Sequence, residues 1–145
     1  MILKLFIALL LSIPFTIINF SAYLKGNPPS TMHLVSTVIF LLLWMLWGFY
    51  INFRDKENTG FIKFSSVYCL VSVACVFVMY LTDSMLFSIP VGIIILGPVY
   101  GLRYFLPSVS YEAFGYICVI VVYTVSLIGT LIGYATSKKV ELKQQ

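Results

Sequence analysis

Apolar residues follow one another along this chain in five long stretches, which are separated by short polar or proline-containing breaks. The stretches cover about residues 2–24, 33–53, 64–81, 85–105 and 113–136. Each is close to the length of roughly 20 apolar residues that crosses a bilayer as a helix. The pattern therefore predicts an all-α integral membrane protein, a bundle of five transmembrane segments that forms one domain over residues 1–145, with no soluble domain.

The run from residue 64 to residue 105 is too long and too apolar to be one element. Its only strongly polar break is Thr82-Asp83-Ser84, and its first basic residue is Arg103. As a single helix the run would be about 60 Å long, twice the thickness of the hydrocarbon core. The chain must therefore turn at the break and come back, which predicts a membrane-buried helical hairpin with Asp83 at or near its tip.

The fourth stretch, 85–105, is less regular than the others because helix-breaking residues interrupt it. These residues are Pro90, Gly92, Gly97, Pro98 and Gly101. Interrupted segments are where transporters place ion and substrate sites, and also where a chain dips into the bilayer and returns on the same side. The alternative fold therefore has four spans and a re-entrant fourth segment.

The basic residues between the stretches bear on the choice between these two folds. With five spans, one side carries Lys4, Arg54, Lys56, Lys63 and Arg103, and the other carries Lys25, Lys138, Lys139 and Lys143. With a re-entrant fourth segment, the same residues divide seven to two. The positive-inside rule favours the second division, whereas the hydrophobic length of 85–105 favours a full crossing, which we expect. Both versions place the loop 54–63 in the cytoplasm of a multi-pass protein, and we expect a plasma or inner membrane.

Composition argues against several classes of protein. Of 145 residues, 61% are apolar and 10% are charged, against about 25% charged in an ordinary soluble domain. The net charge of +4 lies in short clusters and not on a basic face with interleaved aromatic residues, so we expect no nucleic-acid partner. Cys69, Cys75 and Cys118 lie inside apolar stretches without a C-x-x-C spacing, which indicates buried thiols and not redox or metal chemistry.

Motifs for catalysis and cofactor binding are missing from the sequence. It contains no G-x-S-x-G, no H-E-x-x-H, no phosphate-cradling glycine loop and no paired carboxylates. His33 is the only histidine, so two histidines of one chain cannot hold a haem. We therefore expect a protein that is not an enzyme and that has no cofactor and no metal.

Four residues are candidates for a functional role, namely Asp83, Asn19, Pro90 and Pro98. A carboxylate within a membrane protein indicates a functional role by default. Asp83 can equally cap the helix that follows it. Asn19 is the one strongly polar side chain in its part of the first stretch, and it indicates a hydrogen bond between helices more than a transport path. The two prolines mark the interruptions of the fourth stretch.

Two pairs of glycines indicate where helices pack closely. Gly97 and Gly101 lie four residues apart on the fourth stretch, and Gly129 and Gly133 lie four apart on the last. In lipid, helices associate through close backbone approach, which small residues permit. We therefore expect these two pairs to face each other within one chain.

The interpretation that we prefer is a protein that acts without catalysis, through helix packing with a membrane-protein partner or with itself. It would be an accessory, regulatory or immunity-type protein of the lipid bilayer. This expectation rests on the small size and on the lack of a soluble domain or catalytic motif. The alternative is a small oligomeric transporter or channel that uses the interrupted fourth stretch and Asp83.

Overall fold

The structure is a computed structural model, and it describes residues 2–54, 60–82 and 89–142. Its elements are α1 (Ile2–Leu24), α2 (Thr31–Arg54), α3 (Gly60–Thr82), the π-helical turn η1 (Gly92–Leu96), the 3₁₀ helix η2 (Gly97–Tyr104) and α5 (Tyr111–Leu142). Four helices are long and apolar enough to cross a membrane, and Ile89–Tyr104 is a shorter apolar segment. The predicted all-helical membrane bundle is therefore confirmed.

Short polar sequences set the ends of the helices. Gly26, which follows α1, has a positive φ of 62° that suits glycine, and two prolines then prevent the helix from continuing. At the start of α2, the N–H of Ser30 donates to Nδ1 of His33, which satisfies one of the free donors of the first turn. At the start of α5, the hydroxyl of Ser110 accepts from the N–H of Ala113.

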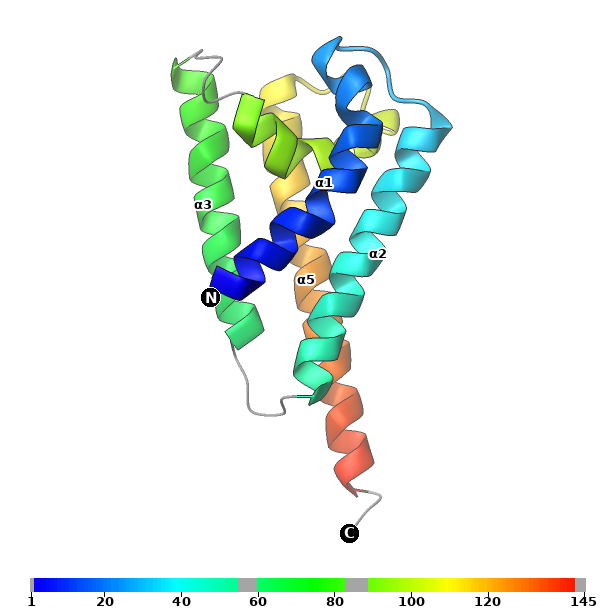
Figure 1. Cartoon of the computed structure of the whole chain (residues 1–145), viewed down its shortest axis with the longest axis vertical. Coiled ribbons are helices and arrows are strands. Elements are labelled where there is room, and N and C mark those ends of the chain that lie inside the picture. The colour runs from blue at the N-terminus through cyan, green and yellow to red at the C-terminus, as the bar shows by residue number, and fades with distance from the viewer. Residues whose placement is uncertain (1, 55–59, 83–88, 143–145) are drawn as a thin grey trace.

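The long helices alternate in direction, as Figure 1 shows. We define the upper end of the bundle by Leu24, Thr31, Thr82 and Tyr111, and the lower end by Arg54, Gly60 and the end of α5. Helix α1 runs obliquely to the upper end, α2 descends, α3 rises, and α5 descends beyond the lower end of α2 (Figure 1). Each connection therefore joins neighbouring ends of antiparallel helices.

The segment Ile89–Tyr104, which we call the fourth segment, stays in the upper half of the bundle (Figure 1). The hydroxyl of Tyr100 donates to the carbonyl of Asn27 in the link between α1 and α2. The guanidinium of Arg103 lies over the ring of Tyr111 at the start of α5. The fourth segment thus returns to the end at which it starts. Its path is that of the four-span alternative and differs from the full crossing that hydrophobic length led us to expect.

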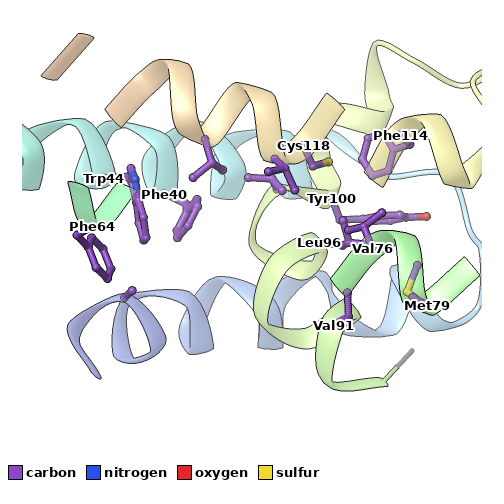
Figure 2. Close-up of a cluster of buried hydrophobic side chains, with 14 of the residues drawn as sticks. Phe40, Trp44, Phe64, Val76, Met79, Val91, Leu96, Tyr100, Phe114 and Cys118 are labelled. Atoms are coloured by element: carbon purple, nitrogen blue, oxygen red, sulfur yellow. The ribbon is translucent and has the colours of Figure 1, made fainter. Parts of the chain in front are cut away.

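The buried side chains form one continuous cluster between the helices (Figure 2). Phe40, Trp44 and Phe64 lie at one end of it, and Leu96 and Tyr100 of the fourth segment lie at the other (Figure 2). Trp44 is 1% exposed and donates from Nε1 to the hydroxyl of Ser126 on α5. The upper half of the core therefore depends on the fourth segment, and the lower half on aromatic packing.

All four glycines of the two pairs lie at close contacts between elements. A Cβ on Gly129 would overlap the carbonyl of Met45, and one on Gly133 would lie 2.5 Å from the carbonyl oxygen of Phe49. A Cβ on Gly97 would lie 2.8 Å from the Thr16 side chain. A Cβ on Gly101 would overlap the carbonyl of His33 on α2. The α5 pair, Gly129 and Gly133, thus faces α2 and not the fourth segment.

The expectation that the two glycine pairs face each other was therefore wrong. The physical reason is the short path of the fourth segment, which reaches only the upper half of α5. Gly129 and Gly133 lie further down α5, where Met45 and Phe49 of α2 are the neighbours.

Candidate functional site

The interrupted backbone of the fourth segment is held by side chains of α1 and α2. The hydroxyl of Thr16 donates to the carbonyl of Ile93 at 2.6 Å, and Nδ2 of Asn19 donates to the carbonyl of Gly97 at 2.8 Å. The hydroxyl of Thr37 donates to the carbonyl of Pro98 at 3.0 Å. We call these three side chains, with the backbone groups that they bind, the polar cluster.

The break in the helix explains why these bonds form here. In the π-helical register of η1, residue 98 would donate to the carbonyl of residue 93, but Pro98 has no N–H. The carbonyl of Ile93 is then free, and an unpaired carbonyl is costly at membrane depth because no water can satisfy it. Thr16 supplies the missing donor. On the other side of the break, the N–H of Gly101 donates to the hydroxyl of Thr37 at 3.0 Å.

The polar cluster is buried and closely packed. Asn19 and Thr37 are both fully buried, as are Gly97, Pro98 and Gly101. The Oδ1 atom of Asn19 is buried and has no hydrogen-bond partner among the described residues. The cluster contains hydroxyl, amide and backbone groups and no ionisable side chain, so it fixes the backbone and offers neither a general acid nor a general base.

The four sequence candidates have different places in the structure. Asn19 and Pro98 are brought together, because Nδ2 of Asn19 lies 3.4 Å from the carbonyl of Pro98 as well as bonding Gly97. Pro90 lies apart from them, in the wall of a surface cavity next to α3. Asp83 lies outside the described residues.

Sequence reasoning missed Thr16 and Thr37. A signal for the first was present, since Ser12, Thr16 and Asn19 recur at helical spacing and form one polar stripe in an otherwise apolar segment. All three side chains are buried. Nothing comparable marks Thr37, because a single threonine in an apolar helix commonly bonds a carbonyl of its own helix.

A second region lies on the flank of the bundle, between α1 and α3. Two adjoining cavities of about 370 and 430 Å³ share Leu5, Tyr68 and Val71 in their walls. We call them together the lateral groove. Its walls are almost entirely apolar, with Val67 of α3 on one side and Ile94 of the fourth segment at its upper end. The groove exists because α1 leans across the bundle and makes almost no direct contact with α3.

Among the residues that the structure describes, no three His, Cys, Asp or Glu side chains lie close enough together to hold a metal ion. In comparisons with known proteins, no family model, no curated protein and no solved structure matches this chain.

Proposed function

We propose that this protein acts without catalysis, as an accessory or regulatory component of a membrane complex, and that it binds one transmembrane helix of a partner protein. The binding surface in this proposal is the lateral groove. The observation that carries the proposal is the shape and chemistry of that groove, which has α1, α3 and the fourth segment as its three walls.

Several features favour a helix as the occupant. The groove follows α3 from Phe64 to Cys75, three turns or about 17 Å of helix. Its α3 wall combines two aromatic residues, Phe64 and Tyr68, with valines and with the small residues Ser72 and Cys75. The small residues allow a neighbouring helix to approach closely. Val67 and Val71 are 40% and 56% exposed, so this face is not covered by the residues that the structure describes.

The distribution of charge supports an orientation. Most of the described basic residues belong to the lower end, namely Lys4, Arg54, Lys63, Lys138 and Lys139. Two belong to the upper end, Lys25 and Arg103. By the positive-inside rule the lower end, with the loop 54–63, faces the cytoplasm. In this proposal the protein is a multi-pass protein of a plasma or inner membrane, with its C-terminus on the cytoplasmic side.

A small oligomeric transporter or channel is the second candidate, and the interrupted fourth segment is the observation in its favour. Against it, the carbonyls at the break are already paired with Thr16, Asn19 and Thr37. A flux assay in liposomes separates the candidates. Flux that disappears in Asp83→Asn would favour the transporter.

Photo-crosslinking within the membrane tests the proposed surface. A photoreactive p-benzoylphenylalanine at Val71 should give one discrete adduct with a membrane protein that also copurifies with the chain. The same group at Leu131, which is 64% exposed on α5 away from the groove, should give none. The variant Val67→Trp fills the groove and should abolish both the adduct and the copurification.

The matched control for Val67→Trp is Leu70→Trp, because Leu70 is 70% exposed on the same helix and is not part of the groove wall. It should leave the complex intact. Adducts with lipid alone, or a complex that survives Val67→Trp, would contradict the proposal. An adduct with the mass of two copies of this chain would mean that the groove binds a second copy and not a different protein.

A further inference from the structure

Arg103 is a cation at the upper end of the bundle with an incomplete set of partners. Its guanidinium carbon lies 3.8 Å from the centre of the Tyr111 ring and 5.4 Å from that of Phe114. Its Nη2 donates to the carbonyl of Val109 at 3.2 Å. Its Nη1 atom is buried and has no hydrogen-bond partner in the part of the chain that the structure describes. Two aromatic rings and one carbonyl thus hold the group in place without neutralising its charge.

A buried guanidinium N–H group without a partner is energetically costly. A buried charged donor without an acceptor forgoes both hydration and a hydrogen bond. Within the described part of the chain, no carboxylate pairs with Arg103. Glu112, in the first turn of α5, is exposed at the surface. Arg103 as a whole is only half-buried, so its side chain is open to an anionic partner from outside the described part of the chain.

A cavity of about 330 Å³ has Arg103 in its wall. Its walls come from two parts of the chain that are far apart in sequence. The link after α1 contributes Gly26, Pro28 and Pro29, and the region around the end of η2 contributes Arg103, Tyr104, Pro107 and Tyr111. Proline fixes its own φ, so three of the seven wall residues are rigid. The missing side chain of Gly26 leaves room for the Tyr111 hydroxyl, which would lie only 3.0 Å from a Cβ at that position. We call this cavity the Arg103 basin.

The ligand chemistry follows from these walls. A guanidinium is a planar donor that suits phosphate and carboxylate oxygens. Tyr104 and Tyr111 are 47% and 42% exposed, and such residues sit at the level of lipid headgroups with a ring toward lipid and a hydroxyl toward water. A cavity of a few hundred cubic ångströms is of the size that takes small ligands.

We propose that the Arg103 basin binds the phosphate group of a ligand at the upper membrane surface. The phosphate approaches the guanidinium from the basin, and the tyrosine rings contact the part of the ligand next to it. A lipid headgroup and a free phosphate present this same chemistry. The site lies apart from the lateral groove, so the proposal stands independently of the proposed function.

The test measures thermal unfolding of the purified full chain in a neutral detergent, followed by the fluorescence of Trp44 and Trp47. Three probes are added separately, namely dihexanoyl phosphatidylglycerol, dihexanoyl phosphatidylcholine and inorganic phosphate. A ligand that binds the folded state raises the unfolding temperature in proportion to its occupancy. We expect the glycerol lipid to raise it more than the choline lipid, because choline offsets the phosphate charge.

The variant Arg103→Gln should weaken binding of the anionic probe by about tenfold, the effect of losing one charge-assisted contact of about 1.4 kcal/mol. Lys25→Gln is the matched control, because it removes the same charge from an exposed residue at the same end. It should leave the binding unchanged within about twofold, as expected for an exposed charge.

If Arg103→Gln does not fold, Tyr104→Glu replaces it, since it places a negative charge at the exposed rim and leaves the contacts of Arg103 intact. It should abolish the stabilisation by the anionic probe. A response to inorganic phosphate that Arg103→Gln removes would support the same site with a free-phosphate source. No response to either anion, equal responses to both lipids, or an equal loss in Lys25→Gln would overturn the proposal.

Discussion

The hydroxyl of Thr16 donates to the carbonyl of Ile93 at 2.6 Å, in the place of the N–H that Pro98 lacks. The two residues are 77 positions apart in sequence. A defect made by one proline is thus repaired by a side chain of a distant helix. This relationship holds the fourth segment at its depth in the bundle, and so it also positions the upper end of the lateral groove.

Removing the Thr16 hydroxyl should therefore destabilise the fold. Thr16→Val keeps the shape of the side chain and leaves the Ile93 carbonyl unpaired, which should lower the free energy of unfolding by about 1 kcal/mol. Thr124→Val is the control, because the exposed Thr124 hydroxyl only bonds the carbonyl of Ile120 in its own helix. Unfolding in detergent is the measurement. Equal losses in the two variants would show that Thr16 does not repair the break.

Asn19 should prove to be a structural residue. Asn19→Leu keeps the branched shape and the number of side-chain heavy atoms and removes the donor to Gly97, which should cost about 1–3 kcal/mol of unfolding free energy. In the transporter alternative the same variant would instead change solute flux. Stability and liposome flux would be measured on the same preparations. Unchanged stability together with altered flux would contradict the structural role.

The contact of α5 with α2 should be sensitive to side-chain size at Gly133. Gly133→Leu forces a side chain against the Phe49 backbone and should cost about 1–3 kcal/mol, the usual range for overpacking. Ala135→Leu adds similar bulk at an exposed position of the same helix and should be nearly neutral. The two unfolding temperatures are compared in one detergent. A loss in Ala135→Leu as large as that in Gly133→Leu would mean that the glycine face is not the tight contact.

Trp44 and Ser126 should be energetically coupled. Ser126→Ala leaves the Nε1–H of Trp44 unpaired in the core, which should cost about 1–3 kcal/mol. Trp44→Phe removes that donor, so Ser126→Ala should cost less in the Trp44→Phe background. A double-mutant cycle on unfolding free energies should give a coupling of about 0.5–3 kcal/mol. Strict additivity would argue against this hydrogen bond.

The long helices could be predicted closely because hydropathy reports directly on them. The stretch 33–53 corresponds to Thr31–Arg54, and 113–136 lies within Tyr111–Leu142. The helix α5 continues past the apolar stretch, because polar residues such as Lys138 and Lys139 favour helix without needing lipid. Hydropathy marks only the part that lies in the membrane.

The path of the fourth segment was harder to predict. Hydropathy tells whether residues tolerate lipid and not whether the chain crosses it, so 85–105 favoured a full span. The division of basic residues carried the better information, because it depends on which end each link occupies. Pro98 gave a local reason for a break, but its consequence depends on a donor in α1 that only the tertiary structure brings near.

The candidate site was predictable only in part. Asn19 stood out because an amide is rare in an apolar helix, whereas Thr16 and Thr37 resemble many threonines that bond their own helix. The lateral groove arises from the tilt of α1, which no local pattern encodes. The Arg103 basin combines two links that are far apart in sequence.

The most direct test of this account is the side of the membrane on which the two ends of α5 lie. The native cysteines are replaced, and single cysteines are introduced at the exposed Ser108, just before α5, and at the exposed Lys139, near its end. An impermeant maleimide applied to intact cells should label Ser108→Cys, and it should label Lys139→Cys only after permeabilisation. Labelling of Lys139→Cys from outside, with Ser108→Cys protected, would mean either that the fourth segment crosses the membrane or that the bundle has the opposite orientation, and either result would contradict the account.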